Sequence, residues 1–313
     1  MISICKTPYE QLTETLDPIQ VYGGYSLKRG DLFRLGPVNG SKVRQCLAIV
    51  HYLLRGRDGR QTRGLVTGGG LPSPQVAIVA AVANYFGLPC AITTPRYREG
   101  LRDYRRINSS LAQRLGAAVY GVGNPRSSGY EKDAKVLAAH LGYEQIKFGM
   151  FGEVALEPVI RQVQNVPDYI RRIVVIAGSG LSAISILRGL ARYRKTHVED
   201  VHVVTLSHHF ERNRRLWYYS QKAERYQGRI WVHESPFPYG AEYKHNEEMF
   251  FDLTYESKAW AWLTATYPPD ERILFWIVGR RNYNLDLIEP IRWHMSPHEE
   301  ALREPAPEFQ LAV

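Results

Sequence analysis

The stretch IVVIAGSGLSAIS, residues 173–185, carries three successive signals of one fold class. Five apolar residues predict a short buried strand, the Gly-Ser-Gly that follows predicts a tight turn, and the remaining residues begin a helical pattern. The backbone N–H groups of such a turn and of the helix start can hold an anion together. Three hydroxyl groups could add donors, those of Ser179, Ser182 and Ser185. A turn that serves only the chain reversal is the alternative, since neither GxGxxG nor GxxxxGK[ST] is present.

The same alternation of short apolar runs and amphipathic helices extends along the chain in both directions. Most of the expected helices end at a glycine, which is the usual C-terminal signal. A polar segment with two prolines, from Glu157 to Asp168, predicts the place where the chain crosses between domains. Strand and helix alternating in this way predict an α/β protein with a mostly parallel sheet. Further strands are expected at 64–67, 90–93, 117–120, 201–206 and 273–278.

The composition excludes several classes of protein. Of the 313 residues, 44% are hydrophobic and 23% charged, which is typical of a globular protein. No apolar run approaches the ~20 residues of a membrane helix, and the first residues do not form a secretory signal. Cys5, Cys46 and Cys90 lie far apart without CxxC spacing, so neither a disulfide scaffold nor a metal site is indicated. We expect a cytoplasmic protein.

The net charge of +9 is high for an enzyme of free metabolites. It fits a solvated basic surface or an anionic substrate, and it also fits contact with nucleic acid. The arginines gather in two clusters, and Trp217, Tyr218 and Tyr219 follow the second. Basic residues interleaved with aromatic residues can follow a nucleic-acid strand by charge and stacking. The first cluster is Arg96, Arg98, Arg102, Arg105 and Arg106, and the second is Arg212, Arg214 and Arg215.

Two further segments could carry chemistry. GPVNGSKVRQ, residues 36–45, places Lys42 at or just inside a helix start. A helix N-terminus disfavours a protonated amine, so this lysine could act as a nucleophile toward an aldehyde, although a surface cation is the simpler alternative. TGGGLPSPQ, residues 67–75, predicts a backbone-lined loop before an apolar helix. Such a loop could receive a carboxylate, or it could be a plain connection.

In this order, these segments resemble the fold-type II pyridoxal-phosphate enzymes, whose fold is tryptophan synthase β-like. The chain most resembles their 1-aminocyclopropane-1-carboxylate deaminase and D-cysteine desulfhydrase group. The similarity is collinear over roughly residues 7 to 280. The matching segments are Thr7-Pro8, KRGDL (28–32), GSKVR (40–44), NSSLAQRLGA (108–117), GSGLSA (178–183) and DLTYESKAWAWL (252–263).

The resemblance implies that pyridoxal 5'-phosphate is the cofactor and that Lys42 holds it as a Schiff base. It also implies that Glu256 pairs with the pyridine nitrogen, which would keep the ring an effective electron sink. The cofactor phosphate would be bound by Gly178, Ser179, Gly180, Leu181 and Ser182. The remaining residues carried over from the family are Tyr255 beside the cofactor, Tyr239 as another active-site tyrosine and Ser73 facing the substrate.

The resemblance also implies two three-layer α/β domains with twisted, mostly parallel sheets. The larger, cofactor-binding domain would comprise residues 1–55 and 160–313, and the smaller inserted domain residues 56–159. The cofactor would lie in the cleft between them, and a homodimer is expected because relatives of this fold are commonly dimers.

The chain departs from the group mainly where the substrate would lie. Pro74 replaces an asparagine that bonds the cofactor's phenolic oxygen, and Ser41, Leu181 and Arg280 also replace group residues. The first hypothesis is a lyase or deaminase, with carbon–nitrogen, carbon–sulfur or carboxyl cleavage left open, acting at Cα or Cβ of an amino acid through the Lys42 Schiff base. The second is the same chemistry, decarboxylating or eliminating, on an amino acid attached to nucleic acid, as in phage DNA base hypermodification. The third is a catalytically inactive relative.

Overall fold

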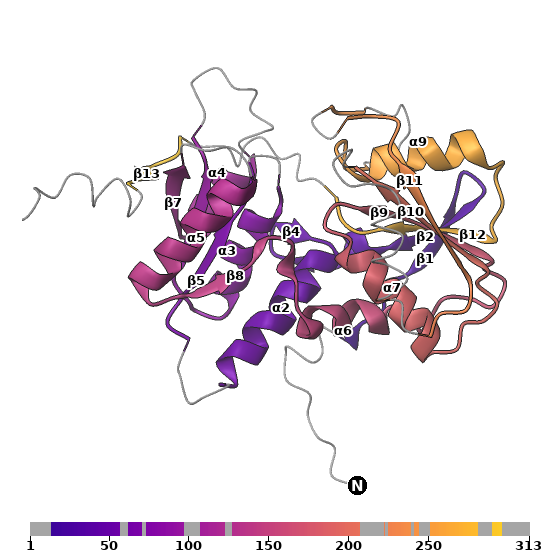
Figure 1. Ribbon diagram of the computed structural model, residues 1–313, viewed down its shortest axis with the longest axis horizontal. Coiled ribbons are helices and arrows are strands. Elements are labelled where there is room, and N and C mark those ends of the chain that lie inside the picture. Colours follow the sequence, from indigo (N-terminus) through magenta and orange to yellow (C-terminus); the bar gives the residue numbers. More distant parts are fainter. Residues whose placement is uncertain are drawn as a thin grey trace, which may run out of the picture. The chain divides into compact units, whose positions relative to one another are not determined.

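The structure is a computed structural model of the 313-residue chain, and it forms two compact units (Figure 1). Unit 1 comprises Met1–Arg55 and Gly149–Asn282, and unit 2 comprises Gly56–Phe148 and Tyr283–Val313. The residues that the structure describes are 14–56, 62–70, 73–96, 107–122, 127–206, 222, 225–238, 241–243, 251–280 and 290–295.

Unit 1 is built on a six-stranded sheet in the order β1-β2-β12-β9-β10-β11. The first two strands form an antiparallel hairpin, and every other neighbouring pair is parallel. The central strand β12 therefore joins the N-terminal hairpin to β9. The strands are β1 (Ile19–Tyr22), β2 (Tyr25–Arg29), β9 (Arg172–Ala177), β10 (Asp200–Thr205), β11 (Arg229–Glu234) and β12 (Ile273–Ile277).

Helices cover both faces of this sheet (Figure 1). On one face, α9 (Glu256–Thr266) buries Trp260 and Leu263 in a cluster with Val174 and Phe275 of the strands. On the other face lies α7 (Leu181–Arg192), with α6 (Glu153–Arg161) and α2 (Ser41–Leu54) packed in the same layer. Because successive strand residues point to opposite faces, β9, which is apolar from Ile173 to Ala177, packs against both layers.

Unit 2 has an all-parallel sheet in the order β13-β7-β6-β5-β8. Helix α5 (Ser127–Leu141) packs its Ala134 and Leu137 against Val66 and Ala91. Helices α3 (Gln75–Tyr85) and α4 (Ile107–Arg114) pack against each other and on the sheet. The strands are β5 (Leu65–Gly68), β6 (Cys90–Pro95), β7 (Ala117–Val122), β8 (Glu144–Ile146) and β13 (Trp293–His294).

Short elements complete the described chain. In unit 1, a 3-10 turn at Gly30–Leu32 precedes a two-stranded ribbon of β3 (Arg34–Leu35) and β4 (Val38–Asn39). A second 3-10 turn, Phe148–Met150, lies where the chain passes from unit 2 to unit 1. None of the helices in the described ranges combines the length and the apolar character needed to cross a bilayer.

The α/β class with mostly parallel sheets is confirmed, while the limits of the two units differ from the expected ones at two places. The chain returns to unit 1 after Phe148, before the polar segment expected to mark the crossing. Part of that segment forms α6, which tolerates Pro158 and packs on α2 and α7. The C-terminal residues belong to unit 2 because β13 pairs with β7.

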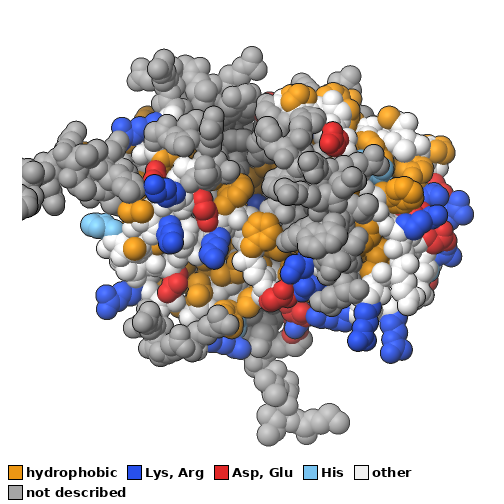
Figure 2. All heavy atoms as spheres, in the orientation of Figure 1, with side chains coloured by type: hydrophobic (Ala, Val, Ile, Leu, Met, Phe, Trp, Pro, Cys, Tyr) orange, Lys and Arg blue, Asp and Glu red, His pale blue; other side chains and the backbone are white. Residues whose placement is uncertain are grey.

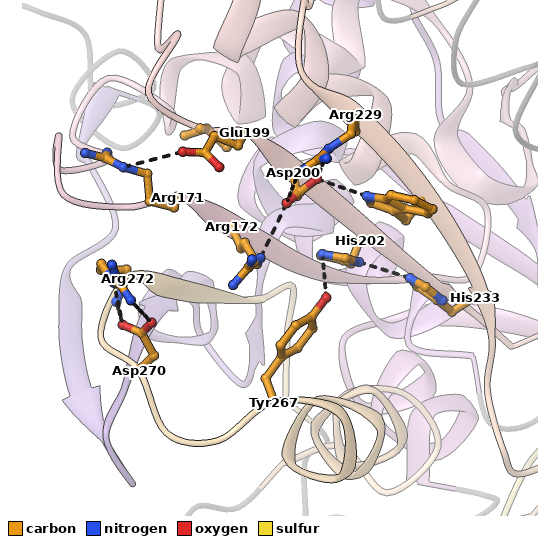
Figure 3. Close-up of polar contacts among 12 residues, drawn as sticks. Arg171, Arg172, Glu199, Asp200, His202, Arg229, His233, Tyr267, Asp270 and Arg272 are labelled. Atoms are coloured by element: carbon orange, nitrogen blue, oxygen red, sulfur yellow. Dashed lines mark hydrogen bonds and ion pairs between the residues drawn. The ribbon is translucent and has the colours of Figure 1, made fainter.

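Polar side chains connect the amino ends of β9, β10 and β11 (Figure 3). The Asp200 carboxylate accepts hydrogen bonds from Arg229 Nε at 2.7 Å and from Trp231 Nε1 at 3.0 Å. Deeper in the unit, His202 Nδ1 and His233 Nε2 are 3.0 Å apart, and His202 Nε2 lies 3.3 Å from the Tyr267 hydroxyl. Burial, together with the neighbouring His233, lowers the pKa of His202 to about 4.

We predict that His202 makes the fold acid-sensitive. Between pH about 4 and 6.5 the unfolded chain binds a proton at this residue that the folded chain does not, so the free energy of unfolding falls as the pH falls through this window. The fall should be on the order of 2–3 kcal/mol. Urea unfolding of wild type and His202→Gln at a series of pH values measures this fall. It is the difference between the two proteins in the slope of unfolding free energy against pH. The exposed His140→Gln is the control, and equal slopes in all three proteins would contradict the prediction.

Candidate active site

The described residues of unit 1 that were predicted for the site lie at the carboxyl ends of two adjacent strands or on segments bonded to them. β9 ends at Ala177 and continues into the turn at 178–180, and β12 ends at Ile277 and continues into 278–280, called here the 278–280 turn. Because β9 and β12 are hydrogen-bonded parallel neighbours, both turns leave the same edge of the sheet. This edge is where α/β proteins bind their ligands.

The turn after β9 has the geometry of an anion site. Gly180 adopts a left-handed conformation, with φ 85°, and caps the start of α7. The first N–H groups of a helix have no partner within the helix and point outward from its start. Leu181, which replaces a glycine of the group, turns its side chain into the core and leaves its backbone N–H in this position. Ser182 is also in the first turn of α7.

Ser185 does not join these donors. Its side chain is fully buried, and its hydroxyl donates to the carbonyl of Leu181 at 3.0 Å. A serine hydroxyl inside a helix often bonds the carbonyl four residues back in this way. The expectation of three hydroxyl donors was therefore wrong at this position.

Lys42 is the second residue of α2, as the sequence predicted. The helix begins after Gly40, whose φ of 98° is a conformation that side chains rarely adopt. Lys42 is partly buried, and burial lowers the pKa of its amine to about 8. A substantial fraction of the amine is consequently neutral near pH 7.5, unlike that of an ordinary lysine. A neutral amine is the form that attacks an aldehyde.

A buried ion pair fixes the first turn of α2. Arg44 Nη2 lies 2.6 Å from Asp17 Oδ1, and both side chains are almost fully buried. The guanidinium carbon also lies 3.6 Å from the centroid of the Phe33 ring. Removing one partner of such a pair leaves an uncompensated buried charge and costs about 3–5 kcal/mol. The backbone next to Lys42 is thus fixed by the ion pair of Arg44 with Asp17 and by the stacking of Arg44 on Phe33.

Glu256 is the first residue of α9 and is 2% exposed. Its Oε1 accepts hydrogen bonds from the N–H groups of Val278, at 3.2 Å, and Gly279, at 3.1 Å. Burial, followed by the nearby carboxylate of Asp252, raises the pKa of Glu256 well above its ordinary value. A buried carboxyl with a raised pKa in a site is a candidate for holding a proton against a ligand.

Val278 connects this carboxylate to the lysine segment. Its N–H donates to Glu256, and its carbonyl accepts a hydrogen bond from the N–H of Ser41 at 2.7 Å. Ser41 directly precedes Lys42. The segments that carry the lysine and the carboxylate are therefore bonded to the same residue, although they come from opposite ends of the chain. The sequence signal for this turn was only an apolar strand followed by Val-Gly-Arg, and the turn was not predicted as part of the site.

Tyr255 extends the site to the turn after β9. A Cβ placed on Gly178 would lie 3.2 Å from Cε1 of Tyr255, so the ring lies against that glycine. Asp252 Oδ1 accepts the N–H groups of Thr254 and Tyr255 at 2.8 and 3.1 Å and fixes the start of α9. Tyr255 and Glu256 are thus adjacent residues that reach the two neighbouring strand ends.

Ser73 belongs to unit 2. It is 4% exposed, and its Oγ accepts the N–H of Gln75 at 3.4 Å. Pro74 caps α3, where its missing N–H removes no helical hydrogen bond. Of the two arginine clusters, only Arg96, an exposed residue just after β6, is described. The other predicted residues lie outside the described parts of the chain, namely Tyr239, Arg98, Arg102, Arg105, Arg106, Arg212, Arg214 and Arg215.

The sequence matches no family model. A curated relative is the O-seryl-dTMP PLP-dependent decarboxylase of Salmonella phage ViI, which is 27% identical over 186 residues. The match covers 53% of this chain and 41% of the relative, so this chain spans less than half of the relative's length.

Solved structures share the fold over most of their length. An ACC deaminase homologue has a TM-score of 0.68 and 19% identity, with 90% of this chain and 100% of that chain covered. Maize serine racemase has a TM-score of 0.60 and 12% identity, with 86% and 89% covered. Escherichia coli diaminopropionate ammonia lyase has a TM-score of 0.58 and 11% identity, with 92% and 86% covered.

The chain therefore has the fold of the fold-type II pyridoxal-phosphate enzymes, and the resemblance drawn from the sequence is confirmed. Unit 1 offers chemistry that fits their cofactor, pyridoxal 5'-phosphate. An amine with a lowered pKa suits its aldehyde, the helix start after Gly180 suits its phosphate, and the buried carboxyl of Glu256 suits its pyridine nitrogen.

We predict that Gly40 is required for the lysine segment to reach the 278–280 turn. A Cβ on this residue would lie 2.5 Å from the carbonyl oxygen of Val278 and 2.8 Å from Cα of Gly279. Gly87 also has a positive φ, of 68°, but open space around it, so Gly87→Ala is the matched control. Gly87→Ala should cost about 1–2 kcal/mol of unfolding free energy, and Gly40→Ala clearly more. Equal losses in thermal or urea unfolding would contradict the prediction.

Proposed function

We propose that this chain is a pyridoxal-phosphate-dependent enzyme of the lyase or deaminase type, acting at Cα or Cβ of an amino-acid substrate. The observation that carries the proposal is the shared bonding of Ser41 and Glu256 to Val278, because it joins the backbone next to a lysine of lowered pKa and a buried carboxyl to one strand end. The bound cofactor supplies an electron sink for the bonds at Cα.

The protein's own residues take separate roles in this proposal. Lys42 carries the cofactor and then moves the proton at the substrate Cα. Glu256 holds a proton at the pyridine nitrogen through Oε2, since Oε1 accepts two backbone N–H groups. The backbone from Gly178 to Ser182 binds the phosphate. By the resemblance, Tyr255 takes the role of the tyrosine beside the cofactor, Tyr239 that of another active-site tyrosine and Ser73 that of the serine that faces the substrate.

A nucleotide-linked or nucleic-acid-linked amino acid is the second candidate substrate. The name of the phage relative describes decarboxylation of a serine attached to a nucleotide. The net charge of +9 and the two arginine clusters support an anionic substrate of this kind. On the face that Figure 2 shows, the described basic side chains have acidic ones among them, so the support from charge rests on the two clusters in the sequence. The homodimer and the cytoplasmic location stay predictions.

We predict that Lys42→Ala abolishes the visible absorbance band of the lysine-bound cofactor and lowers turnover by at least about a hundredfold, because both need the same amine. The control is Lys132→Ala, an exposed lysine of α5. Spectra of the purified protein are recorded with a panel of amino acids and modified nucleosides. A band that persists in Lys42→Ala would remove the proposal. A wild-type band that responds to no compound would favour the inactive relative.

We predict salt-sensitive DNA binding if the substrate is attached to nucleic acid. Changing the five arginines of the first cluster to glutamine should weaken binding at low salt. It should also flatten the dependence of log Kd on log salt by about 0.9 for each phosphate that the protein no longer neutralises. The control changes five exposed basic residues elsewhere to glutamine, namely Arg55, Arg63, Lys132, Lys135 and Lys147. Fluorescence anisotropy with single- and double-stranded DNA measures both. Wild-type protein without affinity for DNA at low salt would exclude a substrate attached to nucleic acid.

A further inference from the structure

The side chain of Asn39 makes a two-point contact with the 278–280 turn. Its Oδ1 accepts the N–H of Arg280 at 2.7 Å, and its Nδ2 donates to the carbonyl of Arg280 at 2.9 Å. Asn39 is the last residue of β4 and lies three positions before Lys42. An amide side chain that binds both polar groups of one residue fixes the position and the direction of the backbone there.

This contact completes a set of bonds along the whole turn. Val278 is bonded to Ser41 and Glu256, Gly279 donates to Glu256, and Arg280 is bonded on both sides to Asn39. The backbones also touch, since a Cβ on Gly40 would meet both Val278 and Gly279. The turn thus lies directly on residues 39–41, with Ser41 holding its first residue and Asn39 its last.

The two hydrogen bonds between Asn39 and Arg280 hold the turn where its N–H groups reach the Glu256 carboxylate. The two N–H groups that reach Glu256 do so at 3.1 and 3.2 Å, whereas the shorter bond from Asn39 holds the Arg280 N–H at 2.7 Å. Two residues after Arg280, the chain leaves unit 1. A turn released at Arg280 would therefore be free to withdraw the N–H groups from Glu256.

Loss of these two N–H donors would raise the pKa of Glu256 further. The bonds from Val278 and Gly279 lower the pKa of Glu256 and partly offset the effect of burial, which raises it. Without them, the carboxyl would keep its own proton more strongly. It would then be a poorer anionic partner for a protonated pyridine nitrogen.

We propose that Asn39 is a positioning residue for the cofactor: by fixing Arg280, it holds the 278–280 turn so that Glu256 and Lys42 keep one geometry. The inference rests on the proposed function, because it assigns Glu256 to the pyridine nitrogen. Asn39 acts through the turn, so its replacement should change the affinity for the cofactor and the pH at which the bound cofactor titrates.

The test compares Asn39→Ala with Asn39→Ser, whose single hydroxyl can keep one of the two bonds. The matched control is Asn84→Ala, because Asn84 also bonds a backbone carbonyl, that of Leu115 at 3.4 Å, but in unit 2. Each protein, freed of cofactor, is titrated with pyridoxal 5'-phosphate. The readouts are the dissociation constant, the position of the visible band and the pH midpoint of that band, and urea unfolding of the cofactor-free form gives the stability.

Asn39→Ala should bind the cofactor about tenfold more weakly, as expected for the loss of hydrogen bonds of ordinary strength, and its band should titrate at a shifted pH. Asn39→Ser should lie between Asn39→Ala and wild type, and Asn84→Ala should match wild type. A change in unfolding alone, with wild-type affinity and pH midpoint, would overturn the positioning role and leave the proposed function standing. Absence of the band from the wild-type protein would overturn both.

Discussion

Two peptide hydrogen bonds at Val278 are the constraint on which the site depends. One bond runs to the backbone just before Lys42, and the other runs to the carboxylate of Glu256. The peptide group that joins Val278 to Gly279 is planar and rigid, so its C=O, which accepts from Ser41, and its N–H, which also donates to Glu256, keep a fixed relation to each other. The separation of lysine and carboxylate is thus set by a strand end, which is more precise than a pair of flexible side chains.

Burial shifts the pKa values of Lys42 and Glu256 in opposite directions, and both shifts favour the uncharged group. The pKa of the Lys42 amine falls and that of the Glu256 carboxyl rises, so the neutral form of each group is more populated than it would be in water. A ligand that brings an aldehyde, a phosphate and a basic ring nitrogen would supply a partner for each group. The polypeptide is therefore tuned to the chemical groups of one cofactor.

The parts of this arrangement that the sequence predicted are local. The strand–turn–helix at 173–185 and the helix start at Lys42 follow from patterns of about ten residues, which hydrophobic period and turn chemistry specify. Glu256 was found only through the family resemblance, which supplied the long-range information. The sequence marked the 278–280 turn only as a departure from the group, and its bonds to Asn39 and Ser41 could not be predicted, since they join segments far apart in the chain. The sequence offered Ser185 as a further hydroxyl donor, but within the helix its hydroxyl donates to the carbonyl of Leu181.

The strand order has a consequence for biosynthesis. β12 occupies the centre of the six-stranded sheet but comes last of its strands along the chain. Until the ribosome has released residues 273–280, the N-terminal hairpin and β9 have no common neighbour, and Glu256 lacks its two amide donors. Nascent chains fold as their segments emerge, so this edge of the sheet is completed only after β12 has emerged. A nascent chain that stops before residue 278 therefore lacks the turn that bonds both Ser41 and Glu256.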